Sequence, residues 1–391
     1  MIRVRFIAPS SGSLLVTGAR VALANAAFAR SQRGHFILRS AASELGWLGI
    51  EWDAVSEPGD YASAIEHLKK IGCLYPCFES ETELRAKQEH RVRRGRSAIY
   101  DRAMLKLTEE QRATAEAGGK RPYWRLRLSN RTVTWTDAIT GPRESKLTAV
   151  SDPILVAADG TPAAALTAVV DDIADRITHV IRADDGDAAT GIHIDLLSAL
   201  GVRPHTFTFA HLPALGQTGR LAIRSFRNDG VEPEALVEWL GCGAGFNLRG
   251  LVRIPDPTAL PALNRNVLAR REFAAVRDRL PRGATEPFWM AIRGHIDLLT
   301  EARHWWDVVN GTIFPAIPEG AGGLIEAARV ALPPEPWDTS TWPAWLAAIP
   351  ADAHQASELR LILTGEERGP ELAALLPLIG RSRVMERLRG A

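Results

Sequence analysis

The sequence predicts an α/β fold, in which a parallel-sheet domain of the nucleotide-binding type carries an inserted subdomain and precedes a shortened all-helical C-terminal region. Three observations support this prediction. The first forty residues alternate strand, turn, helix and strand. A charged segment then interrupts this pattern, and from about residue 255 the chain reads as helices separated by prolines such as Pro350. With 391 residues, the chain is long enough for two or three domains.

The N-terminal elements follow in order. Residues 2–8 alternate apolar and polar side chains, as a half-buried strand does, and small residues at 9–13 predict a turn. The Ala-rich residues 18–30 predict a helix, and residues 34–39 predict the next strand. This order is typical of the start of a βαβ unit. Residues 152–157 and 177–182 predict further strands of the same sheet, with helices at 163–174, 192–200 and 233–240.

The interrupting segment predicts a subdomain of its own. Residues 79–119 are charged and predict helices, whereas residues 123–128 and 132–137 alternate like two paired strands. We therefore expect four parts: the first half of the parallel-sheet domain (1–78), the insertion (79–150), the second half (151–254) and the helical region (255–391).

Composition excludes several classes of protein. The chain has 47 Lys and Arg against 46 Asp and Glu, a net charge of +1, which excludes a uniformly basic nucleic-acid binder but allows local basic patches. No run of 18 apolar residues predicts a membrane helix, and the first residues lack the apolar stretch of a signal peptide. Three cysteines cannot form a disulfide framework, so we expect a cytoplasmic protein with no membrane association.

Several motifs occur in an order that resembles the glutamyl-tRNA synthetases, which are class I aminoacyl-tRNA synthetases, nearly from end to end. They include the stretches at 5–10 and 18–20, the Trp-Leu-Gly stretch at 47–53, residues 177–182, and Leu-Arg-Leu-Ile-Leu-Thr-Gly at 359–365. The resemblance implies a Rossmann-like catalytic-type domain, an insertion that faces the tRNA acceptor stem, and an anticodon-binding-like helical region that is shortened in this chain.

The two ATP signature motifs of that family are degenerate here. The resemblance places a His-Ile-Gly-type motif at a helix N-terminus, where Leu15 replaces the imidazole donor and only Gly18 survives. It places Lys-Leu-Ser-Lys-Arg at residues 220–224, where Ile223 replaces the inner lysine and Arg220 keeps one charge. Loss of one such donor typically costs about 100–1,000-fold in rate. The degenerate signature positions are Leu15, Val16, Thr17, Gly18, Arg220, Ile223 and Arg224.

The amino-acid pocket is also altered. The acidic segment that the resemblance places between Arg39 and Trp47 is mostly deleted, and nothing in the spacing recommends Glu44 as a substitute. Arg5 and Arg182 resemble the residues that contact the glutamate carboxylates. A pair of guanidinium groups suits a dicarboxylate or a phosphate. The alternative is that both arginines form structural ion pairs at strand ends.

A basic run in the insertion is a candidate RNA contact, because several arginines on one helix neutralise phosphates. The alternative is an ordinary solvated helix face, since glutamates are interspersed. We expect no metal site, because Cys73 and Cys77 lack further cysteine ligands nearby. The pair Asp171-Asp172 could resemble a Mg²⁺ site, but we interpret it as strand-end and helix-cap residues. The basic run comprises Arg85, Lys87, Arg91, Arg93, Arg94 and Arg96.

From these features we expect a pseudoenzyme that has lost ATP-dependent activation of glutamate. Its candidate partners are tRNA, an acidic small molecule or a protein in a larger complex, and it requires no cofactor; ATP and Mg²⁺ enter only if the ancestral activity survives. The first alternative is a residual glutamate–tRNA ligase or an enzyme repurposed toward glutamate or glutamyl-tRNA. The second is a structural subunit of a larger complex.

Overall fold

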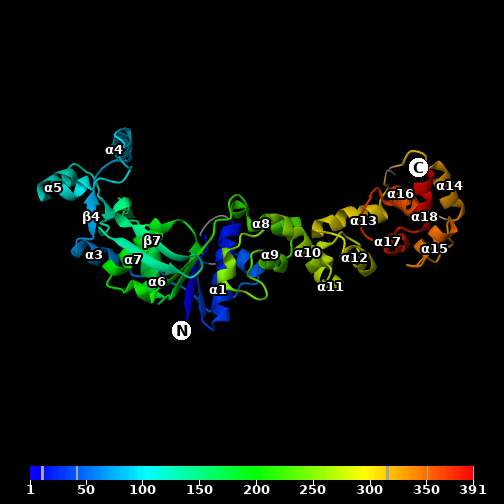
Figure 1. Cartoon of the computed structure of the whole chain (residues 1–391), viewed down its shortest axis with the longest axis horizontal. Coiled ribbons are helices and arrows are strands. Elements are labelled where there is room, and N and C mark those ends of the chain that lie inside the picture. The colour runs from blue at the N-terminus through cyan, green and yellow to red at the C-terminus, as the bar shows by residue number, and fades with distance from the viewer. Residues whose placement is uncertain (10–12, 41–42, 314–316, 350, 391) are drawn as a thin grey trace. The chain divides into compact units, whose positions relative to one another are not determined.

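The computed structural model describes residues 1–9, 13–40, 43–313, 317–349 and 351–390, which form two compact units (Figure 1). Unit 1 comprises residues 1–223 and 244–254, and unit 2 comprises residues 224–243 and 255–391. Residues 224–243 thus group with the helical region, while the four-part division stays a prediction. The predicted turn at 9–13 lies largely outside the described residues. Residues 41–42, between Arg39 and Trp47, and Pro350 also lie outside them.

Unit 1 contains the parallel sheet. Strands β1 (Arg3–Ile7), β2 (His35–Arg39) and β3 (Ala54–Val55) pair in parallel, and helix α1 (Val16–Ser31) connects the first two. Strands β9 (His179–Ala183) and β10 (Thr208–Leu212) form a second parallel pair. The two groups meet where the Thr178 amide donates to the Arg3 carbonyl at 2.9 Å. The predicted βαβ start and the strand at 177–182 are confirmed.

Helices complete unit 1, and the apolar faces of those at residues 61–70, 164–174 and 187–199 share a core with the inserted strands. Leu166, Val169, Leu196, Leu197 and Phe209 lie in that core and are at most 2% exposed. This packing explains why the predicted helix at 163–174 forms nearly as expected. The predicted helix at 192–200 begins earlier, at Asp187. The helices are α2 (Ser43–Trp47), α3 (Tyr61–Lys70), α6 (Ala164–Ala174) and α7 (Asp187–Ala199).

The inserted elements correct two predictions. Strand β8 (Ile154–Val156) pairs antiparallel with β5 (Tyr123–Leu126), so residues 152–157 do not belong to the parallel sheet. Strands β5 and β6 (Thr132–Asp137) are not paired with each other: β5 also pairs with β4 (Leu74–Cys77), and β6 pairs with β7 (Gly141–Lys146). A short turn ending at Gly141, whose φ is +84°, joins β6 to β7. Helices α4 (Glu81–Arg93) and α5 (Glu109–Ala117) lie in the insertion.

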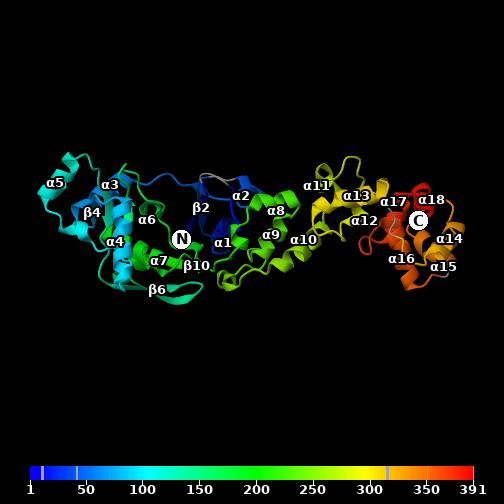
Figure 2. The same cartoon turned by 90° about the horizontal axis from the view of Figure 1, so that it is seen from above.

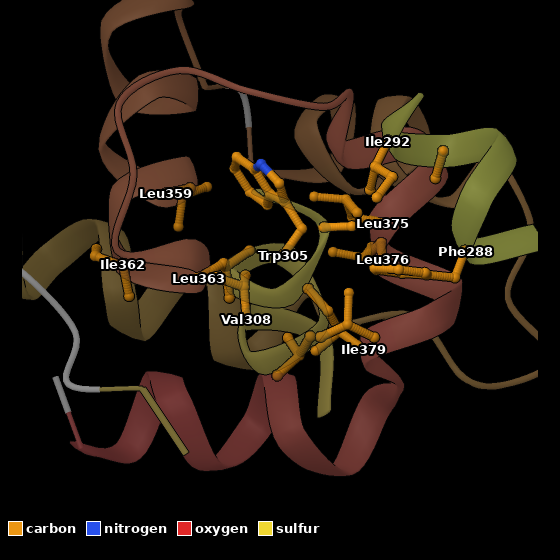
Figure 3. Close-up of a cluster of buried hydrophobic side chains, with 14 of the residues drawn as sticks. Phe288, Ile292, Trp305, Val308, Leu359, Ile362, Leu363, Leu375, Leu376 and Ile379 are labelled. Atoms are coloured by element: carbon orange, nitrogen blue, oxygen red, sulfur yellow. The ribbon is translucent and has the colours of Figure 1, made fainter. Parts of the chain in front are cut away.

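Unit 2 is helical and has its own core. Trp289 and Trp345 are fully buried in it and Trp305 is 5% exposed, which agrees with a packing role for these tryptophans. Figure 3 shows Trp305 among apolar side chains of neighbouring helices, including Leu375 and Leu376. The helices are α8 (Ile223–Asp229), α9 (Pro233–Trp239), α10 (Leu260–Leu268), α11 (Phe273–Val276), α12 (Glu286–Ile292), α13 (Ala302–Asn310), α14 (Gly322–Val330), α15 (Thr341–Ala348), α16 (Ala353–Thr364), α17 (Leu372–Ile379) and α18 (Arg381–Gly390). None of the described helices in either unit is long and apolar enough to cross a bilayer.

Candidate functional site

The two degenerate signature stretches lie side by side at the N-terminus of α1. The Val16 amide donates to the Leu221 carbonyl at 2.9 Å, and the Ile223 amide donates to the Leu14 carbonyl at 2.8 Å. Leu15 and Ala222 form an isolated antiparallel bridge. Segments about 200 residues apart in sequence are therefore joined by backbone hydrogen bonds, which form whatever the side chains are.

The side chains at this junction are mostly apolar. Leu15 is the N-cap residue of α1 and makes no capping hydrogen bond, and the first turn of the helix carries no acidic residue. Leu15 is 44% exposed and Leu221 is 49% exposed, whereas Ile223 is fully buried. The Thr17 hydroxyl donates to the Gly219 carbonyl at 3.1 Å, so it is engaged within the junction. Gly18 is half-buried, and Arg220 and Arg224 are exposed.

Arg5 lies in a buried ion-pair cluster. Its side chain is 4% exposed, and its Nη2 donates to Asp172 Oδ1 at 2.7 Å and to the Ala168 carbonyl at 2.9 Å. Asp171 also accepts from Tyr61 and Arg39, at 2.8 and 3.0 Å. The aspartate pair lies within α6, so its expected place at a strand end or helix cap was wrong. The guanidinium is bound on several sides by protein acceptors, which an acidic ligand would have to displace.

Arg182 lies in a more open position, with 25% of its side chain exposed. Its Nη2 donates to Thr190 Oγ1 at 2.6 Å, and its Nε donates to His211 Nε2 at 3.3 Å. His211 Nε2 is thus an acceptor, so its Nδ1 carries the proton that is donated to Asp137 Oδ2 at 2.5 Å. Arg182 Nη2 also lies 3.7 Å from Oδ1 of Asp185, whose side chain is exposed. The chain Asp137–His211–Thr190 therefore orients the guanidinium of Arg182.

Burial, hydrogen bonds and nearby charges shift the pKa of three groups in this part of unit 1. Burial would raise the pKa of Asp137, but hydrogen bonds from His211 and from the Thr140 and Ile139 amides lower it to about 2. Burial raises the pKa of Asp172 to about 6 although Arg5 opposes this shift. Burial, with the nearby charges of Arg182 and Arg5, lowers the pKa of His193 to about 3. His193 is consequently neutral at pH 7.

The basic run follows α4 and the loop after it. Arg85 and Arg93 each form an ion pair with a glutamate one turn earlier, at 3.2 and 3.1 Å, and Lys87 pairs with Glu79. The Nε of Arg91 donates to the Ser97 carbonyl at 3.1 Å. Within the described residues, the side chains of Arg94 and Arg96 make no ion pair or hydrogen bond and are exposed. Helix α4 has no buried residue, so all of this charge is presented at the surface.

No group of three or more His, Cys, Asp or Glu among the described residues is arranged to hold a metal ion. Cys73, Cys77 and Cys242 form no disulfide among the described residues. Burial raises the pKa of the Cys77 thiol to about 11, and its sulfur lies 3.7 Å from the Tyr100 hydroxyl. Such a thiol stays protonated at neutral pH, and a protonated thiol is a poor nucleophile.

A family model described as "tRNA synthetases class I (E and Q), catalytic domain" matches residues 1–224. The glutamate–tRNA ligase 2 of Granulibacter bethesdensis is 46% identical to this chain, and the alignment covers 99% of this chain and 98% of that protein. The chain belongs to the glutamyl-tRNA synthetase family. The family prediction made from the motifs is confirmed. The glutamate–tRNA ligase 2 of Gluconacetobacter diazotrophicus is 44% identical, with 99% of each chain covered.

Solved structures agree on the fold. A glutamate–tRNA synthetase from Elizabethkingia anophelis superposes with a TM-score of 0.78 at 19% identity and covers 99% of each chain. A glutamate tRNA ligase from Elizabethkingia meningosepticum, solved with its amino acid, gives a TM-score of 0.76 at 18% identity and covers 99% of this chain and 98% of that one. At this identity, the likeness confirms the class I synthetase fold alone.

The alignment with the Granulibacter ligase also shows that some internal segments are shorter in this chain. It extends over 441 positions, whereas the chain has 391 residues, so at least 50 positions (441 less 391) face gaps in this chain. Because the alignment covers nearly all of both proteins, these gaps are internal. Internal segments of this chain are therefore shorter than the matching segments of that relative.

Sequence reasoning missed some participants of the site. Both ring nitrogens of His211 are hydrogen-bonded. Its partners Thr190 and Asp137 were not singled out, because no motif links residues that lie 53 positions apart (190 less 137) on a helix and a strand end. Glu44, the weak substitute for the missing acidic segment, is buried in α2 beside Ser43.

Proposed function

We propose that this member of the glutamyl-tRNA synthetase family has lost ATP-dependent activation of glutamate and acts in the cytoplasm as a binding protein, with tRNA as its partner. The observation that carries the proposal is the junction of the two signature stretches. Catalysis of adenylation depends on positioned donors around the transferring phosphate. At this junction the backbone geometry is intact, while Leu15 is an exposed apolar side chain and Ile223 is a buried one.

The decisive experiment is ATP–pyrophosphate exchange with glutamate, with and without total tRNA from the source organism. We expect no exchange above a protein-free background, beside a positive control with an active glutamyl-tRNA synthetase. Robust exchange by the purified chain would refute the proposal. It would support the alternative that the chain is a glutamate–tRNA ligase. An Arg220→Gln variant then tests whether the charge retained at the first position of the second signature supplies the missing donor.

The RNA part of the proposal is supported by α4 and its following loop. Arg94 and Arg96 are exposed and make no ion pair with described residues, so they are the cations most available to phosphates. We expect each Arg→Gln change to weaken tRNA binding and to reduce the salt dependence by about one phosphate contact. Filter binding at several salt concentrations measures this slope, and Arg30→Gln, a change at an exposed arginine of α1, is the control. Equal slopes for all three variants and the wild type would contradict RNA contact at α4.

A second candidate function is recognition of an acidic small molecule, and the positioned guanidinium of Arg182 favours it. Arg182 is oriented by Thr190 and His211 and remains partly exposed, as a receptor for a carboxylate requires. Calorimetric titration with glutamate tests this function. Binding that Arg182→Gln abolishes supports it, and absence of binding at millimolar glutamate excludes it for this ligand.

A further inference from the structure

A cavity of about 300 Å³ lies in the insertion between one face of α4, the loop at residues 99–101 and strand β5. Its lining includes both apolar side chains and cations. Leu84, Ile99 and the Tyr100 ring form apolar walls. The cations Arg85, Lys87, Arg91 and Arg125 surround them. A cavity of this size is at the small end of ligand-binding pockets, and it is separate from the signature junction and from Arg182.

Helix α4 spans this cavity without filling it. None of its residues is buried, so no side chain of α4 packs tightly against the body of unit 1. The helix is held at its start by a capping box between Ser80 and Glu83, by the Lys87–Glu79 pair, and at its end by Arg91. Figure 1 shows α4 standing out from the rest of the unit, and Figure 2 shows it along its length in front of other elements of the unit. Lys87 lies at the middle of α4, so the helix is anchored there as well as at its two ends.

Arg125 is the buried cation of the lining. It is 9% exposed, and its guanidinium lies 4.2 Å from the centre of the Tyr100 ring. Its Nη1 donates to the Asp152 carbonyl, but its buried Nε has no hydrogen-bond partner among the described residues. A buried charged donor without a partner is costly and normally has an acceptor. A ligand with anionic oxygens in the cavity would supply one.

The remaining charges favour an anion. The two acids of the lining are already engaged: Glu81 pairs with Arg85, and Asp101 accepts the Ala103 amide at 3.0 Å. Arg91 uses only its Nε toward Ser97, which leaves its terminal nitrogens for a ligand. Guanidinium groups bind phosphate through several hydrogen bonds, and aromatic and aliphatic walls suit a base.

We propose that the cavity beneath α4 binds one 5′-phosphorylated nucleotide, with the phosphate at Arg91 and Arg125 and the base along Leu84, Ile99 and Tyr100. The nucleotide is either free or the phosphorylated end of an RNA strand. The second source rests on the proposed tRNA binding, and the first is independent of it.

Titration calorimetry of the full chain at low salt tests the site with 5′-CMP, cytidine and inorganic phosphate. CMP is the probe because a pyrimidine suits a small cavity. We expect CMP to bind at least about tenfold more tightly than cytidine, which lacks the phosphate, and more tightly than inorganic phosphate, which lacks the base. Arg91→Gln should weaken CMP binding about tenfold, whereas Arg30→Gln, at an exposed arginine of α1 outside the lining, should leave it unchanged.

Arg125→Gln, checked for folding by circular dichroism, should also weaken CMP binding. Absence of CMP binding at millimolar concentration overturns the proposal, as does equal binding by Arg91→Gln and Arg30→Gln. A 5′-phosphorylated RNA that displaces CMP identifies an RNA end as the source, and an RNA that does not displace it identifies a free nucleotide. Failure of the pseudoenzyme proposal would appear as pyrophosphate exchange, which this titration does not report.

Discussion

At the scale of single residues, Arg5 is a charged side chain that the fold buries almost completely. It lies against Asp171 and Asp172, and those carboxylates have few other cations nearby besides Arg39. We expect Arg5→Met to lower the free energy of unfolding by about 3–5 kcal/mol, because it leaves two buried carboxylates without this partner. Urea denaturation measures the loss.

The matching control is the double variant in which Asp172→Asn accompanies Arg5→Met. Removing a buried charge together with its partner should recover part of the stability, since the desolvation cost of the carboxylate disappears as well. If Arg5→Met were as stable as the wild type, the ion pairs would be unimportant and Arg5 would be available to a ligand.

His193 makes the stability depend on pH. Its pKa falls from 6.5 to about 3 on folding, so the unfolded chain takes up a proton between these values that the folded chain does not. The free energy of unfolding therefore decreases as the pH falls through this window. Asp172 acts in the opposite direction, because its raised pKa of about 6 lets the folded chain bind a proton first. Because the pKa of His193 shifts further than the pKa of Asp172, we expect the effect of His193 on stability to prevail.

We expect the wild type to lose stability between pH 7 and pH 4.5, and His193→Gln to lose much less over the same range. Urea midpoints at the two pH values give the comparison. His90→Gln, a change at an exposed histidine of α4, serves as the control and should behave like the wild type. A His193→Gln variant as sensitive to acid as the wild type would assign the pH dependence to other groups.

At the scale of elements, α4 depends on its cap. The helix has no buried face, so its stability comes from local interactions, chiefly the capping box of Ser80 and Glu83. We expect Ser80→Ala to destabilise the helix by about 1 kcal/mol. Faster amide hydrogen exchange within 81–93 measures this. Thr108→Ala, which removes the equivalent cap of α5, should speed exchange only in 109–117. Unchanged exchange in α4 would show that another contact holds the helix.

Element prediction from the sequence succeeded where one short stretch decides the outcome. The alternation at 2–8 and the Ala-rich helix after it predicted β1 and α1 correctly. Prediction failed where the pairing partner lies far away in the sequence. Strand β8 is a short apolar strand, and nothing within residues 154–156 shows whether its neighbour is parallel or, like β5, antiparallel. The orientation of Arg182 by Thr190 and His211 escaped prediction for the same reason, since only the fold brings those residues together.

At the scale of the whole molecule, each of the two units has buried apolar residues of its own among the described residues. Trp345 is fully buried in the core of unit 2, and its indole Nε1 donates to the Ala328 carbonyl at 3.0 Å. We expect Trp345→Ala to destabilise unit 2 by about 3–5 kcal/mol, from the cavity left behind. Calorimetry should show a lowered melting transition for the helical unit.

Trp342→Ala, a change at the half-buried neighbour, should lower the same transition by less. Near-UV signals from Trp124 and Trp135 in unit 1 should keep their own midpoint in both variants. Loss of all signals at one lowered temperature would mean that the two cores unfold as one.

The backbone junction between residues 14–16 and 221–223 has a consequence for the history of this chain. Its hydrogen bonds come from main-chain amides and carbonyls, which every residue type except proline supplies in full. A substitution that removes a catalytic side chain here therefore leaves the local architecture in place. Side chains at such a junction can be exchanged while the main-chain hydrogen bonds that join the two segments persist.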